Sequence, residues 1–89
     1  MKEELLLEII EKLCNNKNRL ENADGHLIES IFIDEDYDKD GNIKKGICIN
    51  YLNEVRYNTN ALINNIEEIV NKRCKWYRFS PKGFFLYFE

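Results

Sequence analysis

The sequence predicts an α+β fold: an antiparallel sheet of about four strands with two helices packed on one face, in the order α-β-β-α-β-β. Two segments, residues 2–15 and 60–74, carry apolar residues at helical spacing. Two others are rich in Ile, Phe and Tyr and are interrupted by strong turn signals, Asp40-Gly41 and Pro81-Lys82. A chain of 89 residues can bury one modest core, so we expect a single domain over residues 1–89.

The two helical segments differ in how sharply their ends are defined. In the first, acidic residues in the opening turn favour the positive end of the helix dipole, but Leu20 continues the apolar face and leaves the C-terminal end open. In the second, Thr59 or its Asn neighbours can cap the start. One stripe of this helix contains the apolar residues Leu62, Ile63, Ile66, Ile69 and Val70, with Arg73 at its end.

A first hairpin is expected around Asp40-Gly41. If these two residues form the whole turn, Asp36 lies opposite Lys45, and Phe32 lies opposite Ile49. The second strand is expected to run from residue 42 to residue 57. Its alternating residues are Ile47, Ile49, Tyr51, Val55 and Tyr57. A helix through Ile47, Cys48, Tyr51, Leu52 and Val55 remains an alternative for this segment.

A second hairpin is expected around Ser80-Pro81-Lys82-Gly83, a type I turn with glycine at a bulge position. Pairing Phe79 with Phe85 places Tyr77 opposite Tyr87, and Lys75 opposite Glu89. One face then carries Trp76, Arg78, Phe84, Leu86 and Phe88, and the other carries Tyr77, Phe79, Phe85 and Tyr87. Both faces are apolar, so something other than one layer of helices must cover the second face.

Charge is distributed unevenly along the chain. Residues 1–50 hold 12 acids against 7 bases, a net charge of −5, whereas residues 51–89 hold 4 acids against 6 bases, a net charge of +2. Residues 29–40 contain six carboxylates and one lysine, and residues 72–82 contain five bases and no acid. Such fields influence the choice of partner more than the fold.

The segment Asp36-Tyr37-Asp38-Lys39-Asp40-Gly41-Asn42-Ile43 resembles the start of an EF-hand calcium loop. The matching carboxylates, Asp36, Asp38 and Asp40, are the candidate metal ligands. The resemblance ends at Ile47, which occupies the position where that family has a bidentate glutamate. A solvated acidic hairpin tip is the preferred interpretation, with weak calcium binding as an alternative.

Other chemistry finds little support. The cysteines, Cys14, Cys48 and Cys74, are widely spaced and contain no CxxC pair, so we expect reduced thiols and neither a disulfide framework nor a zinc site with His26. No phosphate-binding loop, histidine pair or nucleophile elbow is present. We therefore expect no enzyme and no cofactor. Without an apolar run of membrane-spanning length or a signal-like segment, a cytoplasmic location is expected.

A binding function remains, with a protein as the preferred partner. Aromatic residues beside arginine are typical of interface hot spots, and an acidic strand suits a basic partner surface. The residues expected to contact the partner are Asp34, Glu35, Asp36, Asp38, Tyr77, Arg78, Phe79, Phe85 and Tyr87. A second copy of the chain could occupy the aromatic hairpin, and the N-terminal helix covering its second face is the structural alternative. Single-stranded nucleic acid, bound by the bases and rings of residues 73–87, is the second candidate.

The finer hypothesis is an inhibitor or immunity-type protein that occludes a nucleic-acid-binding enzyme. Regularly spaced carboxylates can imitate a phosphate backbone. Asn, Ile and Lys, whose codons are rich in A and T, are frequent, whereas alanine occurs only at Ala23 and Ala61, a pattern that suggests an AT-rich bacterial or phage genome. Anti-CRISPR proteins, antitoxins and immunity proteins are the analogous types, although no motif identifies one of those families.

Overall fold

The computed structural model describes residues 3–56 and 58–88 and confirms the predicted α+β order. One additional short helix follows the first, after a break at Asn16. The elements are α1 (Glu3–Asn15), α2 (Lys17–Asp24), β1 (Ile28–Tyr37), β2 (Ile43–Tyr51), α3 (Thr59–Val70), β3 (Cys74–Ser80) and β4 (Gly83–Phe88). Of these described helices, none is long and apolar enough to span a membrane.

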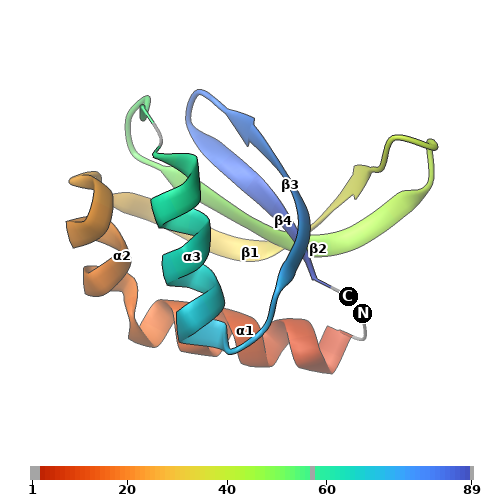
Figure 1. Ribbon diagram of the computed structural model, residues 1–89, viewed down its shortest axis with the longest axis horizontal. Coiled ribbons are helices and arrows are strands. Elements are labelled where there is room, and N and C mark those ends of the chain that lie inside the picture. Colours follow the sequence, from red (N-terminus) through yellow and green to blue (C-terminus); the bar gives the residue numbers. More distant parts are fainter. Residues whose placement is uncertain (1–2, 57, 89) are drawn as a thin grey trace.

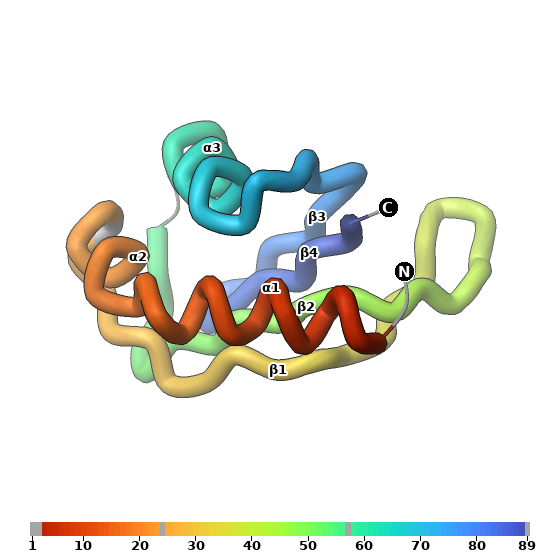
Figure 2. The backbone as a smooth tube through the Cα atoms, turned by 90° about the horizontal axis from the view of Figure 1, so that it is seen from below, coloured from red at the N-terminus to blue at the C-terminus, as the bar shows by residue number. Residues whose placement is uncertain are grey.

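The four strands form one antiparallel sheet in the order β1-β2-β4-β3, with the helices on one face (Figures 1 and 2). The last strand of the chain therefore lies in the interior of the sheet. One hydrophobic cluster joins the inner faces of α1 and α3 to alternate residues of β2 and β4, among them Leu6, Ile47, Ile66, Leu86 and Phe88. The helices thus cover only one side of the sheet, as the sequence predicts.

A helix followed by a hairpin occurs twice in the chain, and each junction is held in the same way. Ile28, the first residue of β1, donates its amide to the Glu21 carboxylate of α2 at 2.7 Å. Cys74, the first residue of β3, donates to the Glu67 carboxylate of α3, also at 2.7 Å. Both helices end on a left-handed residue, Gly25 (φ 75°) after α2 and an asparagine after α3. The same local device sets the direction of both hairpins.

The register predicted for the first hairpin is wrong by one residue. Asp36 lies opposite Lys44, and Phe32 opposite Cys48. The tip is a three-residue loop, because the Asp38 amide donates to the Asn42 carbonyl at 2.9 Å and the Gly41 amide donates back to the Asp38 carbonyl at 3.1 Å. Gly41 has a φ of 80°, which the αL position of this loop type requires.

The register predicted for the second hairpin is also wrong by one residue. Phe79 lies opposite Phe84, and Tyr77 opposite Leu86, while Pro81-Lys82 forms a two-residue turn. Gly83 is required inside the sheet rather than at a bulge, since a Cβ there would lie 2.5 Å from the Ile49 carbonyl oxygen of β2. The irregularity occurs instead between Cys74 and Trp76. The predicted pair of Lys75 with Glu89 lies outside the described residues.

This shift exchanges the faces of the hairpin. Trp76 and Arg78 share the open face of the sheet with Phe85 and Tyr87, which the sequence had placed on opposite sides. The second strand of the first hairpin is confirmed as a strand, so the helical alternative is wrong. It ends at Tyr51, earlier than expected, and Tyr57 lies outside the described residues.

Candidate functional site

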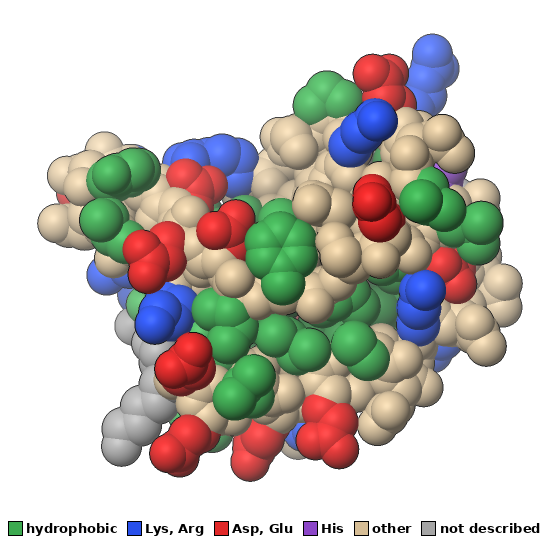
Figure 3. Space-filling view, turned by 180° about the vertical axis from the view of Figure 1, so that it is seen from behind, with side chains coloured by type: hydrophobic (Ala, Val, Ile, Leu, Met, Phe, Trp, Pro, Cys, Tyr) green, Lys and Arg blue, Asp and Glu red, His purple; other side chains and the backbone are tan. Residues whose placement is uncertain are grey.

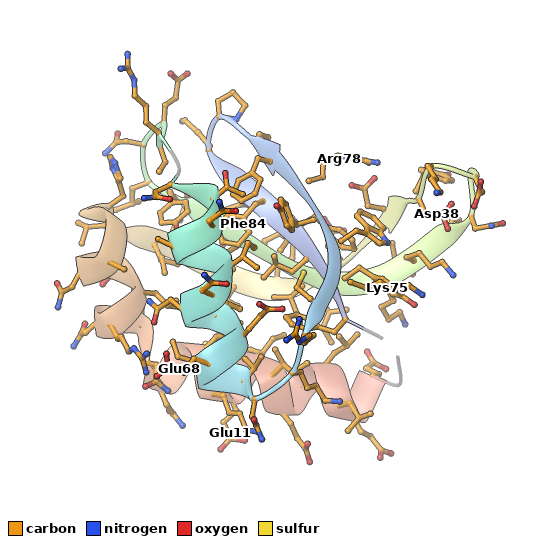
Figure 4. All side chains as sticks on the ribbon, in the orientation of Figure 1. Glu11, Asp38, Glu68, Lys75, Arg78 and Phe84 are labelled. Atoms are coloured by element: carbon orange, nitrogen blue, oxygen red, sulfur yellow. The ribbon has the colours of Figure 1, made fainter. Side chains whose placement is uncertain are left out.

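A groove of about 520 Å³ lies between the two hairpins, on the sheet face opposite the helices. The tip of the β1–β2 hairpin, which extends beyond the rest of the sheet (Figure 1), forms one wall, and β3 forms the other. In Figure 4, Arg78 and Lys75 extend from β3 towards the tip that carries Asp38. The groove is lined by Asp38, Lys39, Asp40, Lys44, Lys75, Trp76, Arg78 and Tyr87.

The floor of the groove is aromatic. The Trp76 ring lies 5.3 Å from the Phe85 ring and 5.7 Å from the Tyr87 ring, between centroids. Phe85 and Tyr87 are only 6% and 8% exposed. Gly46 of β2 contributes, because a Cβ at that position would come within 2.7 Å of the Phe85 ring. The second aromatic face is therefore covered largely by the neighbouring Trp76.

The alternative in which the N-terminal helix covers this face is wrong. The buried residues of α1, Leu6, Ile9 and Leu13, belong to the cluster on the other side of the sheet. Phe85 and Tyr87 are already buried within the chain. They therefore do not form an exposed apolar patch of the kind that dimerisation through the aromatic hairpin would use.

Arg78 connects the two hairpins across the sheet. Its Nη1 lies 2.5 Å from Asp36 Oδ1, and its Nη2 donates to the Tyr37 carbonyl at 2.8 Å. The guanidinium carbon also lies 5.6 Å from the Trp76 ring centroid, and Lys44 Nζ lies 5.7 Å from that of Tyr87. An ion pair this exposed contributes less than about 1 kcal/mol to stability. Its paired hydrogen bonds nevertheless link the hairpin tip to β3.

The predicted partner-binding residues are only partly brought together. Asp36, Asp38, Arg78 and Tyr87 meet at the groove. Asp34 pairs with Gly46 and lies on the same face of β1 as Asp36, the face that carries the groove. Glu35 pairs with a lysine and lies on the face that the helices cover.

The remaining aromatic residues of that prediction lie away from the groove. Phe85 lies beneath Trp76. Phe79 packs at the margin of the core, with its ring 5.1 Å from that of Phe84. Tyr77, at 42% exposure, contacts Phe79 rather than the groove.

Sequence reasoning missed Lys39 and Lys44, and it considered Lys75 and Trp76 only as possible contacts to single-stranded nucleic acid, not as part of a protein-binding groove. The alternation of Trp76 with Arg78 is a signal that places them on one face of a strand. The wrong hairpin register then separated Trp76 from Tyr87. The groove is lined by four basic residues and two acidic ones. From the sequence, an acidic surface and a basic surface were expected at separate ends of the molecule.

The candidate calcium ligands have other roles in the fold. Asp36 pairs with Arg78, and Asp38 accepts the backbone amides of Asp40 and Asn42 at 2.9 and 3.0 Å. Within residues 3–56 and 58–88, no group of three or more His, Cys, Asp or Glu side chains is arranged to hold a metal ion. Calcium binding here stays a prediction that the geometry does not favour.

The hairpin tip is expected to respond to acid. The hydrogen bond from the Asn42 amide is the main cause that holds the pKa of Asp38 below its ordinary value of 3.8. A pKa that is lower in the folded state stabilises the tip above pH 3.8, and this contribution is lost as the pH falls through the lower value. We expect the NMR shifts of the Asp40 and Asn42 amides to titrate with a midpoint below 3.8. Asp38→Asn, which keeps an acceptor oxygen, should abolish that titration, and a midpoint above 3.8 would contradict the assignment.

The two half-buried thiols are poor nucleophiles. Burial raises the pKa of both Cys48 and Cys74 to about 11, and nearby carboxylates add to the effect. Both thiols therefore remain protonated near neutral pH. Neither thiol is therefore activated as a nucleophile in this fold.

Comparison with known proteins adds no assignment to this geometry. The chain matches no protein-family model, and neither a curated protein nor a solved structure shows significant similarity to it.

Proposed function

We propose that this chain is a non-enzymatic protein-binding module that binds its partner through the groove between its two hairpins. One observation carries the proposal: an aromatic floor, Trp76 and Tyr87, is bordered by side chains of both charge signs. Aromatic and arginine side chains dominate the energetics of protein interfaces, and a groove of this size holds one or two partner side chains. The expected partner segment presents an apolar or aromatic side chain between charged ones.

Inhibition of a nucleic-acid-binding enzyme is the finer form of this proposal. The carboxylates of β1 do not form the single ladder that phosphate mimicry needs, because Glu35 faces away from Asp34 and Asp36, and Asp36 is neutralised by Arg78. We therefore expect such an enzyme to contact the mixed-charge groove rather than a row of acids.

The test compares two charge reversals, one on the groove and one away from it. Lys75 lines the groove, whereas Lys82 is exposed in the turn between β3 and β4. A partner is captured from an extract of the encoding organism with the unaltered chain, purified, and titrated calorimetrically against both variants. Lys75→Glu should weaken binding roughly tenfold or more, and Lys82→Glu about twofold at most. Equal affinities of the two variants would refute the groove as the binding site.

Single-stranded nucleic acid is the second candidate, because four basic residues surround the half-buried Trp76. Trp76 is the single tryptophan of the chain, so its fluorescence reports on the groove directly. Stacking of a base should quench this fluorescence during titration with oligothymidylate of about 12 nucleotides, and the affinity should fall steeply with salt. Unchanged emission at roughly 50 mM salt would reject this candidate.

A further inference from the structure

The outer edge of β1 offers a second surface, separate from the groove. β1 is an edge strand of the sheet, and Figure 2 shows it along the border of the molecule. The Asp38 amide bonds to the Asn42 carbonyl of the hairpin, so Asp38 and every second residue before it direct their backbone groups to β2. The intervening residues Ile31, Ile33 and Glu35 direct theirs outward, whereas the Tyr37 carbonyl accepts from Arg78 instead.

Half of this edge is already occupied by the side chains of β1 itself. The Glu35 amide donates to the Asp34 carboxylate, and the Tyr37 amide donates to the Asp36 carboxylate, both at 2.8 Å. Among the described residues, the outward backbone groups of Ile31 and Ile33 have no such partner. The edge is therefore open to strand addition at Ile31–Ile33 and closed beyond it.

The side chains around the open segment are apolar, and their surroundings are acidic. Phe32 is 37% exposed, and Ile31 and Ile33 are half-buried at the margin of the core. Figure 3, which views the molecule from the side of β1, shows a band of hydrophobic side chains with carboxylates on both sides of it. β1 itself contains no base and four acids, Glu29, Asp34, Glu35 and Asp36. Asp36 is paired with Arg78, so the other three supply the negative charge along this strand.

We propose that the Ile31–Ile33 edge accepts an extended segment of a partner protein as a fifth strand. The outward amides and carbonyls supply the hydrogen bonds, as in other examples of β-strand addition. Charge complementarity determines the chemistry of the occupant, which we infer to be apolar at its centre and to carry Lys or Arg on both sides.

The same charges disfavour a second copy of this chain at the edge. Antiparallel pairing of two β1 strands about Phe32 places Glu35 of each copy opposite Glu29 of the other, because Ile31 then pairs with Ile33. Opposed like charges destabilise a strand pair. The Glu35 amide, already bonded to Asp34, would also have to give up that bond to extend the pairing.

The test uses a defined peptide as the probe. A capped peptide of about nine alternating Val and Thr residues with Lys at both ends is added to the ¹⁵N-labelled chain. We expect saturable shifts of the Ile31 and Ile33 amides and about tenfold slower hydrogen exchange at both. Two peptides serve as matched controls. One has Glu in place of Lys at its ends, and the other has N-methyl groups on the backbone amides that would bond to β1. Both controls should bind at least about tenfold more weakly.

Ile33→Pro provides the complementary variant. Proline has no backbone N–H, and the N–H of Ile33 points away from β2. The substitution therefore keeps the hydrogen bonds between β1 and β2, as is usual for proline in edge strands. Circular dichroism checks the fold, and the variant should lose roughly tenfold in peptide affinity.

Equal binding of the N-methylated peptide, or shifts confined to groove residues such as Trp76 and Lys44, would overturn the proposal. Shifts at Ile31 and Ile33 that depend on protein concentration without peptide would assign the edge to a second copy and overturn it as well. The groove proposal is unaffected by these results, because its test uses different residues.

Discussion

Phe88→Ala is expected to lower the free energy of unfolding by about 3–5 kcal/mol, the range for truncating a buried phenylalanine. Phe88 is fully buried, although it is the last residue that the structure describes. It lies on β4, which is bordered by β2 and β3, and it belongs to the same cluster as Leu6 and Leu13 of α1. A domain of this size has a total stability of roughly 5–15 kcal/mol, so the loss should be evident in urea denaturation followed by circular dichroism.

Tyr77→Ala is the matched control for this prediction. Tyr77 is also aromatic, but it lies on the edge strand β3 and is 42% exposed, so its truncation should cost about 1 kcal/mol or less. Similar losses for the two variants would show that β4 does not occupy the interior of the sheet.

Gly46→Ala is expected to destabilise the protein by about 3 kcal/mol, the upper part of the range for overpacking. A Cβ at Gly46 would collide with the Leu86 carbonyl oxygen of the neighbouring strand and with the Phe85 ring, 2.7 Å away. A backbone carbonyl cannot rotate out of the way as a flexible side chain can, so β2 and β4 must separate locally. Displacement of Phe85 should also disturb Trp76 above it, which the tryptophan emission spectrum would report.

Gly25→Ala separates this steric effect from backbone strain. Gly25 has a φ of 75°, but a Cβ there has no atom within 4 Å. Only the left-handed conformation is then penalised, at about 1–2 kcal/mol, and the Trp76 emission should not change. If Gly25→Ala proved the more damaging of the two, close strand approach would not be the reason for glycine at position 46.

The fold class could be predicted because its signals are local. The stripe that includes Leu62, Ile66 and Val70 indicates one face of a helix without reference to any other part of the chain, and these three residues are buried as expected. The turns at Asp40-Gly41 and Pro81-Lys82 were also correctly located. Their loop lengths were not, since the first loop has one residue more than predicted and the second turn has no bulge at Gly83.

The candidate site was only partly predictable for the same reason. Asp36, Asp38, Arg78 and Tyr87 were recognised by residue type, but their meeting in one groove was not. Asp36 and Arg78 are 42 positions apart in the chain and come from opposite edges of the sheet. Nothing near either residue in the sequence indicates the other.

Two principal amphipathic helices, two hairpins and an α+β fold follow from local sequence signals, because helical spacing and turn residues act over a few neighbouring positions. The order of the strands, the aromatic residues that face the groove and the position of Trp76 over Phe85 and Tyr87 are set by contacts between distant parts of the chain. The faces of the aromatic residues depend on a register difference of one residue, which moves every side chain of a strand to the other face. The pairing of β2 with β4, which brings the two hairpins together, depends on close contacts between strands distant in the sequence, at Gly46 against β4 and at Gly83 against β2.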